Sequence, residues 1–156
     1  MRRLLTTILA AGFVAGVLDI LAAFASYVQQ GATVEGILKY IASGLLGAAA
    51  LQGGMAMVWL GLLCHFALTT AMAAIFLLAA LRLRPLTDRP WLWGGVYGVL
   101  TWVAMVYIVV PLSAVPGWKL PEGWSIVSGL LSHIFYVGVP IAHITQYGLR
   151  DTRRSV

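Results

Sequence analysis

The sequence predicts an all-α integral membrane protein with four transmembrane helices. The chain has 156 residues, of which 61% are hydrophobic and only 10% are charged. Soluble domains carry roughly 25% charged residues, so a chain with this composition is expected to be surrounded by lipid. Four apolar runs each approach the ~20 residues that a helix needs to cross the hydrocarbon layer. In lipid, a helix satisfies all backbone groups of such a run internally.

The four expected spans form one membrane domain over residues 1–156. They cover residues 5–28, 55–81, 91–110 and 124–147. Pro85 and Pro90 bracket the loop between the second and third spans, where proline ends a helix. We therefore expect a bundle made of two helical hairpins.

The basic residues predict the orientation. Eight of the ten Lys and Arg residues precede the first span, lie between the second and third, or follow the fourth: Arg2, Arg3, Arg82, Arg84, Arg89, Arg150, Arg153 and Arg154. The positive-inside rule then places both termini and the central loop in the cytoplasm. Because these residues sit at the ends of spans and form no stripe, the net charge of +5 indicates a lipid bilayer as partner and not nucleic acid. We expect a multi-pass protein of a bacterial inner membrane.

A further helix is expected in the first outer connection, over about residues 33–51. Thr33 suits the N-cap position, and Glu35 and Lys39 have the i, i+4 spacing of an ion pair. The segment is too short for a fifth span after its charged start. It is predicted to be an interfacial or a re-entrant helix.

Two short stretches occur twice in the same order, which suggests a duplicated hairpin. Gly61-Leu62-Leu63-Cys64-His65 returns as Gly129-Leu130-Leu131-Ser132-His133, and residues 12–18 match residues 94–100 at five of seven positions. Each half has two spans, so the copies would have the same orientation, as in parallel-repeat membrane folds. The repeated glycines are expected to let helix backbones approach closely: Gly12, Gly16, Gly61, Gly94, Gly98 and Gly129.

One polar residue in each span falls near the same depth. Asp19, His65, Thr101 and His133 each lie nine or ten residues from the outer end of their span, roughly 15 Å in at 1.5 Å per residue. Ionisable groups at that depth usually face the bundle interior or a wet cavity. We expect these four residues to form a midplane layer that binds or conducts a proton, an ion or a small ligand. Ser132 and Cys64 neighbour the histidines but point about 100° away, so they are expected outside a shared ligand set.

Other interpretations of this layer stay open. Asp19 and a histidine could act only as polar glue that fixes helix register, in an accessory or structural subunit of a larger membrane complex. His65 and His133 could be the two axial ligands of a haem in an electron carrier, with Gly61 and Gly129 leaving room for the macrocycle. A metal ion held by Asp19 and both histidines is less favoured, because a third histidine or a second carboxylate is missing. We expect no enzyme, because the sequence holds no known catalytic motif.

The chain resembles small, uncharacterised four-helix proteins of the bacterial inner membrane. The resemblance is carried by residues 12–18, the Gly53-Gly54-Met55 stretch, residues 110–116 and the two Gly-Leu-Leu-x-His stretches. It implies the four-helix fold and no particular activity. Four short helices enclose little volume, so a homo-oligomer or a larger complex is expected.

Overall fold

The computed structural model describes residues 1–154, and the side chains of residues 1–150. Of the basic residues that predict the orientation, the side chains of Arg153 and Arg154 lie outside the described part. Over the described residues the chain is helical, with turns and loops between the helices and no strand. The all-α prediction is therefore confirmed for this part of the chain.

Four helices are long and apolar enough to cross a membrane: Arg2–Val28, Met55–Arg82, Pro90–Leu112 and Trp124–Arg150. The first two are the single helices α1 (Arg2–Val28) and α4 (Met55–Arg82). The third consists of α6 (Pro90–Ala104), the π-helical segment η1 (Met105–Val109) and α7 (Val110–Leu112). The fourth consists of α8 (Trp124–Ser132), the π-helical segment η2 (His133–Gly138) and α9 (Val139–Arg154). Each predicted span thus has a helix, which extends beyond the predicted limits by a few residues.

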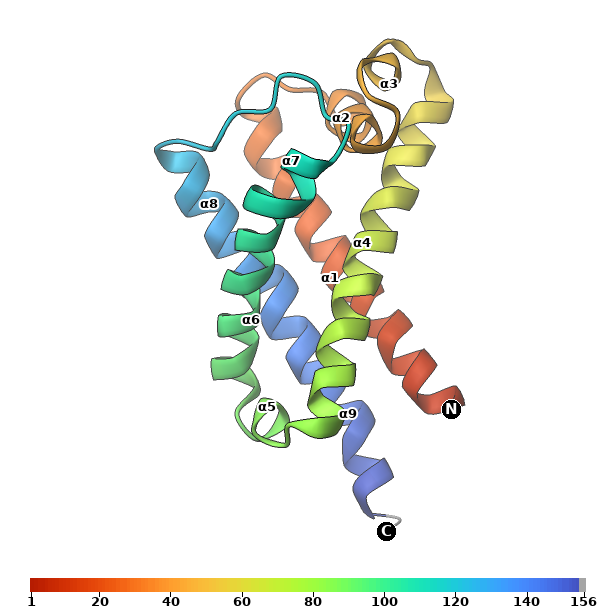
Figure 1. Cartoon of the computed structure of the whole chain (residues 1–156), viewed down its shortest axis with the longest axis vertical. Helices are drawn as coiled ribbons and strands as arrows, with labels where there is room; N and C mark the ends of the chain where they lie inside the picture. The colour runs from red at the N-terminus through yellow and green to blue at the C-terminus, as the bar shows by residue number, and fades with distance from the viewer. Residues whose placement is uncertain (155–156) are drawn as a thin grey trace.

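The four long helices pack side by side into a bundle (Figure 1). Helix α1 packs against α4 and α9, and α6 packs against η2 and α9. Tyr97 ties α6 to α4, because its hydroxyl donates a 2.7 Å hydrogen bond to the Met72 carbonyl oxygen. The N-terminus, the short helix α5 (Pro85–Asp88) and the end of α9 lie at one end of the bundle, here called the terminal end. Helices α2 and α3 and residues 113–123 lie at the other, the α2 end.

The extra helix expected over residues 33–51 is two helices, α2 (Val34–Leu46) and α3 (Ala48–Gln52). They are separated at Gly47, whose φ of 65° lies in the left-handed region that interrupts a right-handed helix. The predicted cap is confirmed, since Thr33 Oγ1 accepts from the Gly36 N–H at 3.0 Å. The predicted ion pair is confirmed as well, with Lys39 Nζ 2.6 Å from Glu35. In Figure 1, α2 is seen end-on, so it lies across the bundle axis.

Four of the repeated glycines lie where two long helices touch. A Cβ at Gly12 would come 2.6 Å from the Thr70 Cα, and one at Gly94 would come 2.7 Å from the Val139 Cα. Gly16 faces the Phe66 ring of α4, and Gly98 faces the His133 carbonyl of η2. Small residues are needed at these positions because a methyl group has no room. In both hairpins the glycines of the first span thus meet the second span; the duplication itself stays a prediction.

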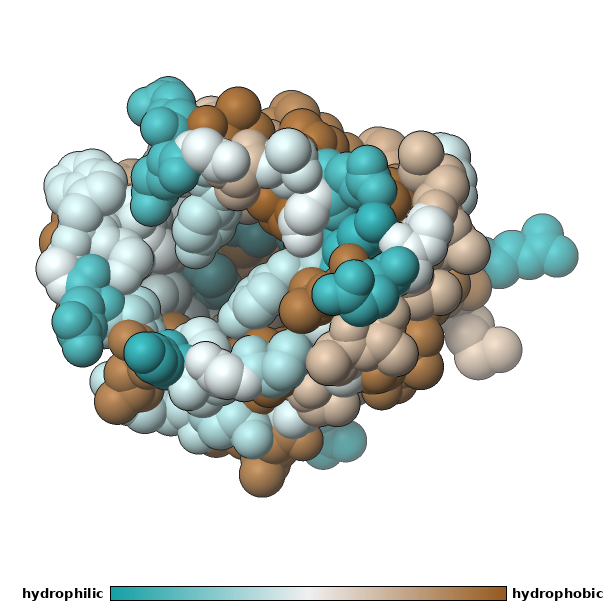
Figure 2. Space-filling view, turned by 90° about the horizontal axis from the view of Figure 1, so that it is seen from above, coloured by the Kyte–Doolittle hydropathy of each residue, from teal (hydrophilic) through white to brown (hydrophobic). Residues whose placement is uncertain are grey.

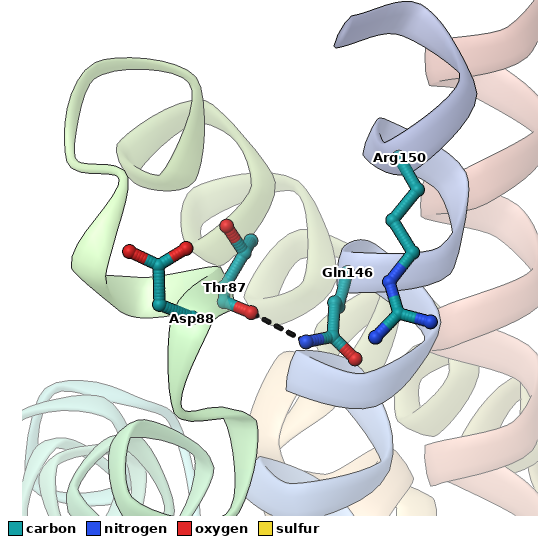
Figure 3. Close-up of a pocket in the computed structure, with 4 residues that line it drawn as sticks. All are labelled: Thr87, Asp88, Gln146 and Arg150. Atoms are coloured by element: carbon teal, nitrogen blue, oxygen red, sulfur yellow. Dashed lines mark hydrogen bonds between the residues drawn. The ribbon is translucent and has the colours of Figure 1, made fainter. Parts of the chain in front are cut away.

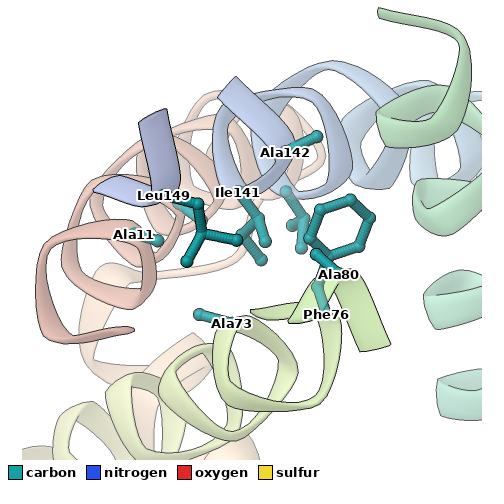
Figure 4. Close-up of a cluster of buried hydrophobic side chains, with 9 residues drawn as sticks. Ala11, Ala73, Phe76, Ala80, Ile141, Ala142 and Leu149 are labelled. Atoms are coloured by element: carbon teal, nitrogen blue, oxygen red, sulfur yellow. The ribbon is translucent and has the colours of Figure 1, made fainter. Parts of the chain in front are cut away.

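Buried apolar side chains fill the bundle toward the terminal end. A cluster of buried side chains joins α1, α4 and α9 there, with Ala11 facing Ala73, Phe76 and Ile141 (Figure 4). Many of its members are alanines, which lets the three helices approach closely. This end of the bundle is therefore closed by apolar contacts.

The outer surface of the bundle is apolar. In the most apolar stretch of each long helix, only 17–28% of the residues are buried. Large apolar side chains such as Phe13, Leu63, Ile75 and Leu100 are exposed around the bundle. Such a surface suits lipid or a hydrophobic partner.

Candidate functional site

A large cavity enters the bundle from the α2 end. Its volume is about 830 Å³. Helix α8 forms one of its walls, and the half of α1 nearer the α2 end forms another. Helix α2 and the middle of α4 close its other sides. Figure 2 looks onto this end and shows a hollow surrounded by pale and hydrophilic residues. A cavity of this size lies within the range of small-molecule sites.

Three of the four predicted site residues line this cavity, namely Asp19, His65 and His133. The fourth, Thr101, is buried and is not among the lining residues. Its hydroxyl donates to the Gly98 carbonyl of its own helix at 3.0 Å. The expected layer therefore includes residues from α1, α4 and the fourth span but no contribution from α6 at Thr101.

Asp19 is held by a residue that we expected outside the ligand set. The Ser132 hydroxyl donates a 2.7 Å hydrogen bond to Asp19 Oδ1, which joins α8 to α1. No hydrogen bond within the described part of the chain reaches Asp19 Oδ2. The 100° angular separation between Ser132 and His133 did not exclude Ser132, because the cavity is wide enough for both residues to line it.

His65 is bound to the backbone of α1. Its Nε2 lies 2.9 Å from the Gly16 carbonyl oxygen, and the side chain is only 8% exposed. A carbonyl oxygen can only accept, so Nε2 carries a proton and Nδ1 is an acceptor in the neutral ring. Gly16 is one turn before Asp19, so α1 brings His65 and the carboxylate to neighbouring levels of the cavity.

His133 is bound to its own helix. Its Nδ1 lies 3.0 Å from the Gly129 carbonyl oxygen one turn earlier. By the same argument Nδ1 carries the proton, and Nε2 is an acceptor in the neutral ring. The two histidines of the repeated stretch therefore make different bonds, one between helices and one within a helix.

Both π-helical segments begin at a residue that lines the cavity. Segment η1 begins at Met105 and η2 begins at His133, and each ends two residues before a proline, Pro111 or Pro140. Proline has no N–H to give to the carbonyl four residues earlier, which favours a widened turn at that point. Segments of this kind are frequent at functional sites because they redirect side chains.

The geometry does not suit a haem between the two histidines. His65 Nε2, the usual axial ligand atom, donates to Gly16. The space beside Gly61 and Gly129, which a macrocycle would need, is also filled. Gly61 lies against the Leu38 backbone, and a Cβ added at Gly129 would lie 2.8 Å from the Trp102 indole nitrogen. Among the side chains of residues 1–150, no three His, Cys, Asp or Glu residues converge closely enough to hold a metal ion.

The mouth of the cavity is aromatic and acidic. Tyr27, Tyr40 and Trp124 line it together with Glu122. Burial raises the pKa of Tyr40 above its ordinary value, and the neighbouring Tyr27 raises it further, so the Tyr40 hydroxyl stays neutral at pH 7. The remaining histidine, His143, lies far from the mouth on α9, where its ring meets the Trp91 ring edge-on at 4.8 Å.

A second, smaller pocket of about 300 Å³ lies at the terminal end. Gln146 Nε2 donates to the Thr87 carbonyl oxygen at 2.6 Å and joins α9 to α5 (Figure 3). In the same view, the Asp88 carboxylate points away from Arg150. These groups do not converge on one point, so this pocket is a weaker candidate than the cavity.

Comparison with protein-family models, curated proteins and solved structures finds no match to this chain. The function therefore has to be argued from the geometry.

Proposed function

We propose that this protein is a non-enzymatic membrane-spanning protein that binds a small solute in the cavity entered from the α2 end. The observation that carries the proposal is a carboxylate deep in a cavity of about 830 Å³. Ser132 holds one oxygen of Asp19 and leaves the other without a protein partner in the described part of the chain. An ionisable group at such depth in a membrane protein usually belongs to a substrate or ion site.

Binding is favoured over conduction because the cavity reaches only one end. Toward the terminal end its floor meets the apolar cluster of α1, α4 and α9, which includes Ala73, Phe76 and Ile141. A conducted proton or ion needs polar groups or water along its path, and these buried side chains offer none. Passage across the membrane would require a second arrangement of the bundle, with the prolines and π-helical segments of the last two spans as its flexible points.

We also propose the membrane orientation. Arg2, Arg3, Arg82, Arg84 and Arg89 gather at the terminal end, which fits a cytoplasmic side. The cavity would then open to the outer side of a bacterial inner membrane. The exposed apolar surface leaves room for a homo-oligomer, and the matching glycine contacts of the two hairpins support a gene duplication.

The test measures whether a water-soluble thiol reagent reaches a cysteine placed in the cavity wall, and whether added solutes protect that cysteine. Ser128 lines the cavity, whereas Leu131 on the same helix is 44% exposed and does not line it. Each is changed to cysteine in a Cys64→Ala background and reconstituted in vesicles. A membrane-impermeant thiol reagent should label Ser128→Cys from one side and leave Leu131→Cys, which faces lipid, almost unlabelled.

The same assay measures binding. Millimolar cationic, neutral and anionic aromatic solutes are added before the reagent, and at least one class should slow the labelling of Ser128→Cys. Failure of the reagent to reach Ser128→Cys, or no protection by any class, would contradict the proposal.

An accessory subunit remains the second candidate, and the exposed apolar surface is the observation in its favour. It predicts that a stoichiometric membrane partner co-purifies with the chain in mild detergent. Purification of the chain alone as one species would count against it.

A further inference from the structure

We propose that the solute is a protonated primary or secondary amine with an apolar body, held through its N–H groups by Asp19 and His133. This inference rests on the proposed function, since it names the class of solute that the cavity takes. It follows from the charge of the lining residues, from the direction of their hydrogen bonds and from the apolar walls.

The charge of the cavity favours a cation. Among the described residues that line it, Asp19 and Glu122 are acidic and none is Lys or Arg. The chain as a whole has a net charge of +5, so basic residues are available and lie elsewhere. Helix α2, which forms one wall of the cavity, has a single lysine, Lys39. Lys39 does not line the cavity and is paired with Glu35 at 2.6 Å. Carboxylates with no basic partner in a concave site attract cations.

Four hydroxyl groups of the wall already donate a hydrogen bond within the protein. Ser132 donates to Asp19, Ser128 donates to the Ser125 carbonyl, and Ser125 donates to the Glu122 carbonyl. Thr69 on the opposite wall donates to the Phe66 carbonyl at 3.2 Å. A hydroxyl has a single hydrogen and two lone pairs, so these groups can only accept further hydrogen bonds.

The histidines act in the same direction. The Gly16 and Gly129 carbonyls fix a proton on one nitrogen of His65 and of His133, so the other nitrogen of each neutral ring accepts. Together with Asp19 Oδ2, the deep part of the cavity offers acceptors to a solute and hardly any donors. A solute that fits must therefore bring donors as well as positive charge.

A metal ion that needs three His, Cys, Asp or Glu ligands does not meet these requirements. No three His, Cys, Asp or Glu side chains among residues 1–150 come close enough for one metal ion. A quaternary ammonium has the charge but no N–H to give. A primary ammonium has three N–H groups, which the Asp19 carboxylate and the imidazole of His133 can share. His133 is chosen because it directly follows Ser132, the residue that is bonded to Asp19.

The walls define the rest of the solute. Apolar side chains from several elements face the cavity, among them Ile20, Ile41, Leu68, Met72, Met105 and Val137. They exclude water beside the charged end and provide contact for an apolar group. Methionines adapt to different shapes, so they suit a range of apolar bodies.

The test compares four probes of one shape on the full chain in lipid nanodiscs. They are 2-phenylethylammonium, its N,N,N-trimethyl analogue, 2-phenylethanol and 3-phenylpropionate, measured by calorimetry and by protection of Ser128→Cys. The primary ammonium should bind tightest. It should exceed the alcohol by about ten-fold or more, the lower value expected for one charge-assisted hydrogen bond. The trimethyl analogue should be weaker than the primary ammonium because it cannot donate.

Two variants locate the charge. Asp19→Asn keeps the shape of the side chain and should remove most of the preference for the ammonium over the alcohol. Asp88→Asn, at the terminal end, removes the same charge outside the cavity and should leave the preference unchanged. The comparison of the four probes on the unaltered chain needs no variant to fold.

The outcomes separate this inference from the proposed function. If the alcohol or the carboxylate protects Ser128→Cys as well as the ammonium does, the cavity binds solutes but the inference is wrong. An equal or tighter trimethyl analogue also contradicts it, because charge alone would then decide. If no probe protects, the inference and the proposed function both fail.

Discussion

Ser132 of α8 donates a 2.7 Å hydrogen bond to the Asp19 carboxylate of α1, across 113 residues of sequence. This bond joins the first and last spans at the depth of the cavity. It orients one oxygen of the carboxylate and leaves the other without a hydrogen bond from the described residues. The same contact thus contributes to helix packing and to the geometry of the candidate site.

Removal of the Ser132 hydroxyl should weaken the bundle and disturb the site together. Ser132→Ala should lower the free energy of unfolding by about 1 kcal/mol, as for other hydrogen bonds between membrane helices. Ser128→Ala is the matched control, because the Ser128 hydroxyl bonds only within its own helix at 3.4 Å. Unfolding by a denaturing detergent in mixed micelles measures both. Equal stabilities of the two variants would show that the Ser132–Asp19 bond contributes nothing to packing.

The close approach of α6 to the fourth span gives a second prediction. A methyl group at Gly98 would collide with the His133 carbonyl oxygen and lie 2.5 Å from the Ile134 Cα. Gly98→Ala should therefore cost about 1–3 kcal/mol, the range for overpacking in a tight interface. A Cβ added at Gly95, on the same helix, would lie 4.0 Å from the Ile134 side chain and so has room. Gly95→Ala should be neutral or stabilising by a few tenths of a kcal/mol, because it reduces the freedom of the unfolded chain.

Thermal unfolding of both glycine variants in detergent tests the contact. Since Gly98 touches the residue at which η2 begins, Gly98→Ala should also reduce the protection of Ser128→Cys by bound solute. A stable Gly98→Ala variant with the melting temperature of the unaltered protein would mean that the two helices are not this close.

The two histidines should differ in what they contribute to stability. His65 bridges α4 and α1 through Gly16, whereas His133 bonds within its own helix. His65→Phe keeps a ring of similar size but loses the bond between helices, and it should cost about 1 kcal/mol more than His133→Phe. For solute affinity the order should be the opposite: His133→Phe should weaken binding more than His65→Phe, since His133 is the proposed contact. Detergent unfolding and calorimetry on the same two proteins give both readings.

Much of the architecture could be predicted from sequence because the bilayer permits few solutions. Long apolar runs must be helices, and Thr33 with Glu35 and Lys39 specified the start of α2 through short-range chemistry. The break at Gly47 was missed, because an apolar, alanine-rich segment looks continuous until a neighbouring loop contacts it. Here the Gly44 carbonyl accepts from the Ala114 N–H at 2.9 Å, a contact over 70 residues of sequence.

The lining of the candidate site could be predicted in part for a similar reason. Counting residues gives depth, and depth pointed to Asp19, His65 and His133, which do line one cavity. It does not give the partner of each group. The Thr101 hydroxyl donates within its own helix, whereas the Ser132 hydroxyl donates to the Asp19 carboxylate. These partners depend on how each helix is rotated about its axis, which tertiary packing decides. The prolines after η1 and η2 were the available signal for the widened turns.

The cap of α2 leads to the last prediction. Thr33 Oγ1 accepts from the Gly36 N–H, and Gly36 with Tyr40 belongs to the cavity wall. Loss of an N-cap hydroxyl typically costs about 1 kcal/mol and frays the first turn. Thr33→Ala should therefore speed amide hydrogen exchange over residues 34–38 while the four long helices keep their protection. The control is Thr6→Ala, whose exposed hydroxyl bonds to the Arg3 carbonyl within α1 and which should leave exchange in α2 unchanged. If α2 forms the wall as described, the faster opening of its first turn should also raise the rate at which a thiol reagent reaches Ser128→Cys. Unchanged labelling together with faster exchange would mean that this turn does not limit entry to the cavity.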